Sequence, residues 1–190
     1  MFNKKLIVCS GPSGSGKTTL VNFILQQNLS FKFSISATSR PPRNNEKKEK
    51  DYYFFTQNEF KKKIQNDEFI EYEEVYKGIY YGTLKSELNR LWSSHNVVLF
   101  DVDVKGGINL KKKYPNETLS IFIKPPSINI LKERLKKRKT ETNKNLKIRI
   151  NKAKKEILFA SKFDIIIIND NLKKTKNNLL DKIKLFLKQK

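Results

Sequence analysis

The sequence is poor in the features of secreted and membrane proteins. It holds a single cysteine, Cys9, so no disulfide can form within the chain, which favours a reducing compartment. Its longest apolar runs, such as Ile165–Ile168, are far shorter than the roughly 20 residues that a membrane-spanning helix needs. Residues 1–5 lead straight into an apolar run, without the small-residue cleavage site of a signal peptide. We therefore expect a cytoplasmic protein without a membrane partner.

Acidic residues are also scarce, since 19 Asp and Glu stand against 40 Lys and Arg, for a net charge of +21. A cationic surface gains affinity for nucleic acid by counterion release, so a nucleic-acid binder is one interpretation. The other is compositional drift, because the chain is rich in Lys, Asn, Ile and Phe, which AT-rich coding favours. The lysines are scattered along the chain, so we expect no specific nucleic-acid partner. In either case the charge favours small phosphorylated ligands.

The chain nevertheless has enough apolar residues for the core of one compact domain. Hydrophobic residues make up 37% of its 190 residues, and 13 of them are phenylalanines. Four apolar runs predict strands, at Lys5–Ser10, Val97–Phe100, Leu119–Ile123 and Ile165–Ile168. The runs Val97–Phe100 and Ile165–Ile168 are typical of central strands of a parallel sheet, whose two faces are both covered by helices. Because helical patterns separate the runs, we predict an α/β core.

The segment after residue 33 breaks this pattern. It contains aromatic-rich pieces, a polar loop with two prolines and one helical stretch, which together predict a small mixed β insertion. Farther along, a basic stretch with spaced arginines predicts a pair of helices. The chain is therefore expected to divide into a core of residues 1–33, 93–134 and 154–190, an insertion of residues 34–92 and a helical segment of residues 135–153.

The strongest motif is a phosphate-binding loop. Its glycines, Lys17 and Thr18 follow an apolar strand and precede a helical pattern, as the motif requires. In such a loop, backbone N–H groups curl around phosphate oxygens, glycines permit positive φ angles, and the next helix points its positive dipole end at the phosphate. Lys17 is expected to reach the β- and γ-phosphates and the Thr18 hydroxyl to ligate Mg²⁺. The loop comprises Gly11, Pro12, Ser13, Gly14, Ser15, Gly16, Lys17 and Thr18.

A second group of polar residues lies in the insertion. Prolines hold Arg40 and Arg43 in an extended loop, and guanidinium forks suit bidentate binding of a phosphate. The hydroxyls of Tyr52 and Tyr81 would complete such a socket. Glu71 follows an apolar pair on a predicted strand, where its carboxylate would accept hydrogen bonds from the N1–H and 2-amino groups of guanine. The ordinary alternatives are solvated arginines, core tyrosines and a surface glutamate.

Taken in order along the chain, these segments resemble those of the guanylate kinases, most closely the bacterial ones. The similar segments cover nearly the whole length: GPSGSGKT, SATSRPPR, KDYYF, FIEYEEVYKGIYYGT, LFDVDVKGG, RLKKRKTET and IIIND. The resemblance implies an α/β fold of the P-loop NTPase type, with a parallel sheet flanked by helices, a mixed-β nucleotide-binding insertion and a helical lid. The sequence departs from the family at Lys139, where the lid usually has a glycine.

The resemblance also implies roles for individual residues. The loop of residues 11–18 would hold the ATP phosphates, with Asn169 on the adenine side. The residues that would grip the GMP phosphate are Arg40, Arg43, Tyr52 and Tyr81. Those that would read guanine or lie near it and the metal are Ser36, Glu71, Thr83, Asp101 and Asp103. The catalytic residues would be Lys17, Arg40 and the lid arginines Arg138 and Arg149, while Thr18 would hold Mg²⁺ together with ATP phosphates and water.

The implied reaction is phosphorylation of GMP, and of dGMP, by ATP with Mg²⁺, in a monomer or homodimer. Two other functions on the same scaffold are alternatives. A ribose-bisphosphate phosphokinase would not need the guanine-reading set of Ser36, Glu71 and Thr83. A non-catalytic domain of a scaffold protein typically has a degraded phosphate loop, whereas Lys17 and Thr18 are both present here.

Overall fold

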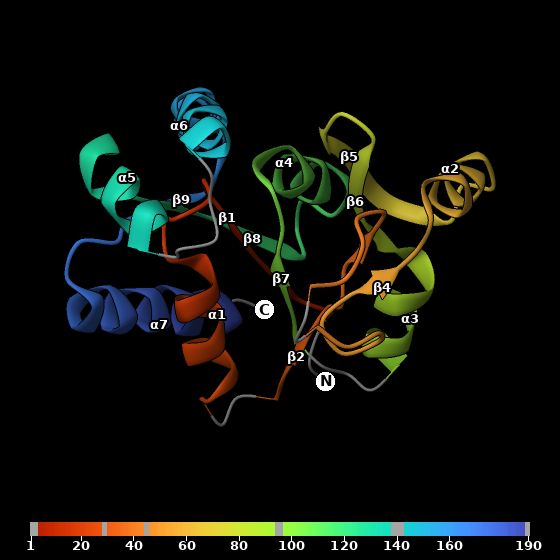
Figure 1. Ribbon diagram of the computed structural model, residues 1–190. Coiled ribbons are helices and arrows are strands. Elements are labelled where there is room, and N and C mark those ends of the chain that lie inside the picture. Colours follow the sequence, from red (N-terminus) through yellow and green to blue (C-terminus); the bar gives the residue numbers. More distant parts are fainter. Residues whose placement is uncertain (1–3, 28–29, 44–45, 94–96, 138–142, 189–190) are drawn as a thin grey trace.

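The computed structural model describes residues 4–27, 30–43, 46–93, 97–137 and 143–188. Its central element is a five-stranded sheet in which all paired strands are parallel. The strand order is β2-β7-β1-β8-β9 (Figure 1). The strands are β1 (Leu6–Ser10), β2 (Phe31–Phe33), β7 (Val97–Asp101), β8 (Thr118–Lys124) and β9 (Ile165–Ile168). The predicted parallel α/β core is therefore confirmed.

Helices cover both faces of the central strands, which explains their continuous apolar sequences. In β1, Ile7 and Cys9 point to a core shared with α1 (Lys17–Leu25) and α7 (Leu172–Lys188). The alternate residues Leu6 and Val8 point to the core beneath the helices of the other face. Those helices are α3 (Lys85–Ser93) and α4 (Val104–Lys113).

The prediction that Ile165–Ile168 is a central strand is wrong. This run forms β9, which is the last strand of the sheet and pairs only with β8 among the described residues. Ile167 is buried against the α7 side, but Ile166 and Ile168 are 45% and 58% exposed. An apolar run shows that a segment favours a strand, but it does not show whether a helix covers each face.

The insertion forms a second sheet with both parallel and antiparallel pairs, as its mixed pattern predicts. The order is β4-β3-β6-β5, in which only β3 and β4 are parallel. Its small core is aromatic, with the ring of Phe60 stacked on that of Phe69 at 4.4 Å between centroids. The elements are β3 (Ala37–Thr38), β4 (Tyr53–Phe54), α2 (Gln57–Gln65), β5 (Phe69–Tyr76) and β6 (Ile79–Leu84).

The predicted pair of basic helices is present as α5 (Ile128–Lys137) and α6 (Asn143–Ile157), which extend beyond residues 135–153 on both sides. The two helices pack through a small apolar cluster that includes Leu131, Leu135 and Ala153. Figure 1 shows this pair on one side of the molecule and the second sheet on the other. In the described part of the chain, no helix is long and apolar enough to cross a membrane.

Candidate nucleotide-binding site

Most of the predicted site residues line one cleft of about 790 Å³ at the carboxyl ends of the parallel strands. This edge of an open parallel sheet is where such folds usually bind ligands. The predicted residues that line it are Gly11, Ser13, Gly14, Gly16, Lys17, Thr18, Ser36, Arg40, Arg43, Tyr52, Glu71, Tyr81, Asp101, Asp103 and Arg149. Pro12, Ser15, Thr83 and Asn169 are not among its lining residues, and Arg138 lies outside the described residues.

The phosphate loop has the backbone that its glycines predict. Gly11, Gly14 and Gly16 all have positive φ angles, of 145°, 86° and 94°. A side chain at Gly11 would also collide with the main-chain oxygen of Ile123, and one at Gly16 with the amide of Asn169. The loop therefore needs glycine both for its dihedral angles and for the close approach of its neighbours.

Lys17 and Thr18 begin α1 and face the cleft. The Lys17 Nζ atom donates to the main-chain oxygen of Gly11 at 2.7 Å, so the ammonium group lies across the mouth of the loop. The Thr18 hydroxyl donates to Asp101 Oδ2 at 3.2 Å, which joins the loop to the end of β7. Within the described ranges, no cluster of three or more His, Cys, Asp or Glu side chains forms a metal site. One hydroxyl and one carboxylate instead fit Mg²⁺ that arrives with a nucleotide, because Mg²⁺ keeps mostly water and phosphate ligands.

Asn169 lies beneath the phosphate loop, where it is buried. Its side-chain amide donates to the main-chain oxygen of Ser15 at 2.8 Å, and its own backbone N–H donates to Lys124. The adenine-side role expected of Asn169 stays a prediction. Arg134 of α5, which was not singled out from the sequence, donates to the main-chain oxygen of Asn169 at 2.9 Å. These contacts connect α5 and β9 to the loop.

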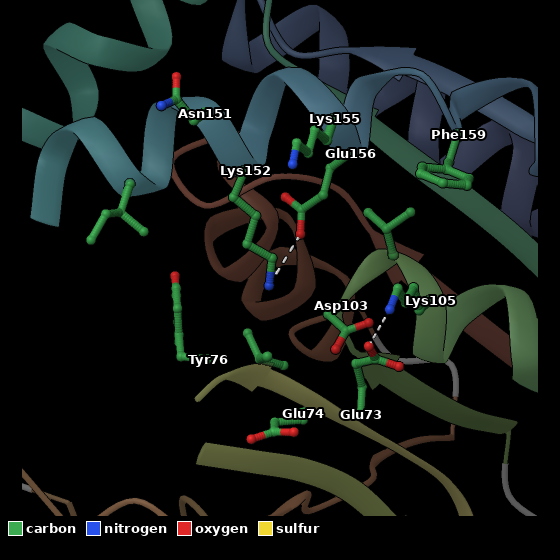
Figure 2. A pocket seen from close by; sticks show the side chains of 13 residues that line it. Glu73, Glu74, Tyr76, Asp103, Lys105, Asn151, Lys152, Lys155, Glu156 and Phe159 are labelled. Carbon is green, nitrogen blue, oxygen red and sulfur yellow. Dashed lines mark hydrogen bonds and ion pairs between the residues drawn. The ribbon is translucent and has the colours of Figure 1, made fainter. Parts of the chain in front are cut away.

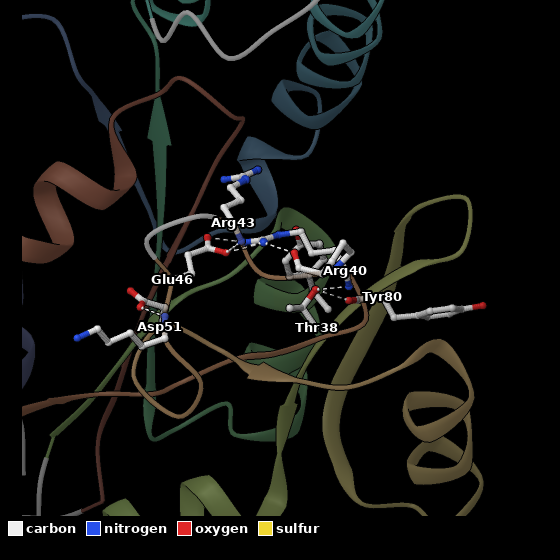
Figure 3. A network of polar contacts seen from close by, with 9 residues as sticks. Thr38, Arg40, Arg43, Glu46, Asp51 and Tyr80 are labelled. Atoms are coloured by element: carbon white, nitrogen blue, oxygen red, sulfur yellow. Dashed lines mark hydrogen bonds and ion pairs between the residues drawn. The ribbon is translucent and has the colours of Figure 1, made fainter.

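Arg40 and its neighbours form a network on the other side of the cleft (Figure 3). The Arg40 Nε atom donates to the Tyr81 hydroxyl at 3.0 Å, and the guanidinium lies 5.0 Å from the ring centre of Tyr52. Both of its terminal nitrogens donate to the Glu46 carboxylate, at 2.6 and 2.7 Å. This ion pair raises the pKa of Arg40 and lowers that of Glu46. The guanidinium fork expected to hold a phosphate is thus occupied by a carboxylate of the same chain.

Glu71 is a buried carboxyl group of β5 that faces the cleft and is only 7% exposed. Burial raises its pKa to about 8, although a hydrogen bond of 2.7 Å from the Thr83 hydroxyl acts in the opposite direction. Thr83 is fully buried and stands opposite Glu71 on β6. The other side of the carboxylate abuts α4, where a Cβ added at Gly106 would lie 2.5 Å from Glu71 Oε2. The carboxylate therefore lies between the Thr83 hydroxyl, which donates to it, and Gly106, where the lack of a side chain leaves room for it.

The helix α6 reaches the cleft on the side of the phosphate loop. Its Arg149 donates from Nη1 to the Ser13 hydroxyl of the phosphate loop at 2.9 Å. A second cavity of about 630 Å³ lies between α6, β5 and the start of α4 (Figure 2). It shares Val75, Tyr76, Asp103, Lys152 and Glu156 with the main cleft. Across this cavity α6 contacts the end of β5 through Lys152, whose Nζ atom lies 5.1 Å from the ring centre of Tyr76.

Besides Arg134, three further residues of this region were not predicted from the sequence. Glu46 lies after two prolines in a polar loop that has no recognisable sequence motif around it. Gly106 belongs to a Gly-Gly pair within α4, and Glu156 is an acidic residue in the otherwise basic helix α6. Burial raises the pKa of Glu156, whose carboxylate lies 3.5 Å from Lys152. A glycine pair inside a helix was the one available signal, because it indicates close approach by another group.

Comparisons with known proteins agree with this architecture. A model of the guanylate kinase family matches residues 3–186. A guanylate kinase of Bacteroides thetaiotaomicron is 51% identical over 183 residues, which are 96% of this chain and 90% of that protein. A guanylate kinase of Porphyromonas gingivalis is 49% identical over 169 residues, 88% of this chain and 90% of that one.

The fold comparison points the same way. The crystal structure of guanylate kinase from Anaplasma phagocytophilum is 28% identical in sequence and matches with a TM-score of 0.80. The match covers 98% of this chain and 87% of that chain. With the phosphate loop and the second sheet facing one cleft, the chain belongs to the guanylate kinase family of nucleoside monophosphate kinases.

Proposed function

We propose that this chain transfers the γ-phosphoryl group of ATP to GMP, giving ADP and GDP. The observation that carries the proposal is that one cleft holds a phosphate loop on one side and a buried carboxylate, Glu71, on the other. The reaction requires a loop that binds the polyphosphate of ATP and a pocket that accepts the two hydrogen bonds of guanine. We also propose that residues 34–92 form the acceptor-binding part and residues 135–153 the lid.

On the donor side, the N–H groups of the loop and the dipole of α1 would hold the ATP phosphates. Lys17, already at the mouth of the loop, would bridge the β- and γ-phosphates. Thr18 and Asp101 would hold Mg²⁺, which neutralises phosphate charge when bound. Asn169 would act on the adenine side, from beneath the loop.

On the acceptor side, the ionised Glu71 carboxylate would accept from guanine N1–H and the 2-amino group. Adenine lacks this pair of donors, so it would leave the Glu71 carboxylate with Thr83 as its hydrogen-bond donor and without a donor from the base. Ser36 and Thr83 would complete the reader of the base, with Asp101 and Asp103 beside it. The acceptor phosphate would lie against Arg40, Arg43, Tyr52 and Tyr81. Because none of these roles requires the ribose 2′-hydroxyl, dGMP would also be accepted.

The chemical step needs no protein base, since the attacking oxygen of GMP is already anionic. Catalysis would come from in-line positioning and from neutralisation of charge on the transferring group. Arg149 already touches the loop, and Arg138, outside the described residues, would join it when the lid closes. Closure of α6 towards β5 would also exclude water and so limit hydrolysis of ATP. The reaction belongs in the cytoplasm, where ATP and GMP occur.

The test is a coupled ADP-release assay with ATP and Mg²⁺, in which GMP, dGMP, AMP, CMP, UMP and ribose 1,5-bisphosphate are offered separately. Activity confined to GMP and dGMP is expected. Activity with the ribose bisphosphate, or equal rates with all nucleotides, would contradict the proposal. If the folded protein releases no ADP with any acceptor, a non-catalytic role replaces the kinase. Retention on heparin at physiological salt, without a GMP-induced rise in melting temperature, would favour a nucleic-acid binder.

A further inference from the structure

The carboxylate of Glu46 lies in the phosphate socket proposed above. It comes from the loop that joins β3 to β4 and forms a two-pronged ion pair with Arg40, in which its side chain is 18% exposed and that of Arg40 9% (Figure 3). Its Oε2 atom also accepts the backbone N–H of Arg43 at 2.8 Å. Three donors therefore surround one carboxylate at the place where a phosphate is expected.

The hydrogen bonds of Arg40 show what remains for a ligand. A guanidinium has five N–H groups. Nη1 donates to Pro41 and to Glu46, Nη2 donates to Glu46, and Nε donates to the Tyr81 hydroxyl. The other N–H of Nη2 has no partner among the described residues, and by the planar geometry of the group it runs parallel to Nε–H, on the side of Tyr81. With Glu46 in place, Arg40 can give a phosphate one hydrogen bond and not a fork.

The same arrangement orients the hydroxyl of Tyr81. Because its oxygen accepts the Nε–H of Arg40, its own hydrogen is available to donate elsewhere. We propose that Glu46 is a positioning residue: it fixes Arg40 and, through it, Tyr81, so that one N–H and one O–H point together at the phosphate of the acceptor. Glu46 stays in place when the acceptor binds. This inference rests on the proposed function, which supplies the acceptor.

The rival arrangement is that the acceptor phosphate displaces Glu46 from the fork. Displacement would break three charge-assisted hydrogen bonds of Glu46 and leave a carboxylate beside a phosphate dianion. Arg40 is also held between its partners, with its guanidinium 5.0 Å from the ring centre of Tyr52 and 5.8 Å from that of Phe54. Binding to the remaining N–H requires none of these changes.

The ion pair with Glu46 also changes which arginine gives the phosphate socket its net positive charge. The pair of Arg40 and Glu46 is neutral as a unit, so it orients the phosphate more than it attracts it. Arg43 lines the same cleft, and its guanidinium forms no hydrogen bond with another described residue. Arg43 is therefore the arginine that would supply net positive charge to the acceptor phosphate.

The test compares GMP with guanosine, which lacks only the phosphate. Both are titrated by calorimetry into the wild-type protein, Glu46→Gln and the control Glu49→Gln, which changes an exposed glutamate of the same loop. We expect Glu46→Gln to weaken GMP binding by about tenfold, the size of one charge-assisted hydrogen bond, and to leave guanosine binding unchanged. Glu46→Asp keeps the charge without reaching the fork and should lose nearly as much. Glu49→Gln should behave as wild type.

Each other outcome has a defined meaning. Tighter binding of GMP by Glu46→Gln would show that the carboxylate competes with the phosphate, which overturns the inference. Equal weakening of GMP and guanosine would reduce Glu46 to a structural role and overturn it too, as would unchanged binding of both. In steady-state assays, the KM for GMP should rise while the KM for ATP stays constant. If the wild-type protein does not bind or phosphorylate GMP, the proposed function fails first, independently of Glu46.

Discussion

In the phosphate loop, three glycines with positive φ and a row of backbone N–H groups lie within eight consecutive residues. The opposite side of the cleft is built from side chains that are far apart in the sequence. There, side chains from β5, β6 and the loop after β3 meet, and their positions depend on buried contacts such as those of Glu71 with Thr83 and of Arg40 with Glu46. Main-chain recognition suits the phosphates common to all nucleotides, while side-chain recognition suits a particular base.

This difference predicts that substitutions on the two sides change different kinetic constants. Changes in the loop should lower the rate of transfer with any acceptor. Changes around Glu71 and Arg40 should alter which acceptor binds and how tightly, with little effect on ATP. The predictions below run from the largest expected effect to the smallest.

Lys17→Ala should have the largest effect. Lys17 is the charge placed at the mouth of the loop, and loss of a preorganised donor to the transition state lowers turnover by about a thousandfold. GMP affinity and the melting temperature should stay near wild type, because the acceptor side and the core are untouched. The assay is ADP release with saturating GMP, and Lys32→Ala, at an exposed lysine of β2, is the control. A near-wild-type rate would remove Lys17 from the reaction.

Gly106→Ala should weaken the binding of GMP without changing that of ATP. The new Cβ would lie 2.5 Å from Glu71 Oε2, so the carboxylate must shift. We expect the KM for GMP to rise by about ten- to a hundredfold, the range of a lost hydrogen bond to a charged group, with an unchanged KM for ATP. In a Glu71→Ala background the same substitution should have little further effect, since the colliding group is gone. Additive effects of the two changes would show that Gly106 acts elsewhere.

The pH dependence of GMP binding should show a smaller effect. Burial raises the pKa of Glu71 to about 8, so the carboxyl group is mostly protonated at pH 7 in the unliganded protein. A protonated carboxyl cannot accept from both guanine donors, so GMP affinity should rise with pH, by roughly five- to tenfold from pH 7 to pH 8.5. ATP affinity should not follow this trend, and Glu71→Gln should abolish it. A flat profile in the wild-type protein would indicate that Glu71 is ionised before GMP binds.

The contrast between the two sides also explains what the sequence alone could predict. The phosphate loop is contiguous and the central strands are local apolar runs, so both were correctly anticipated. The exposed face of β9 was not, because cover for a strand comes from helices elsewhere in the chain. The bounds of helix α4 were not predicted, since its Gly-Gly pair and three lysines give a weak helical pattern. Glu46 and Gly106 matter only through the groups that the fold brings against them.

The most direct test of the account is the binding of three monophosphates, GMP, IMP and AMP, to the wild-type protein and to Glu71→Gln by calorimetry. IMP keeps the N1–H donor of GMP but lacks the 2-amino group, and AMP lacks both. We predict a graded order in the wild-type protein, GMP over IMP over AMP, and a much shallower order in the variant, with ATP binding unchanged. The same steep order in both proteins would show that a group other than Glu71 reads the base, which would contradict the account.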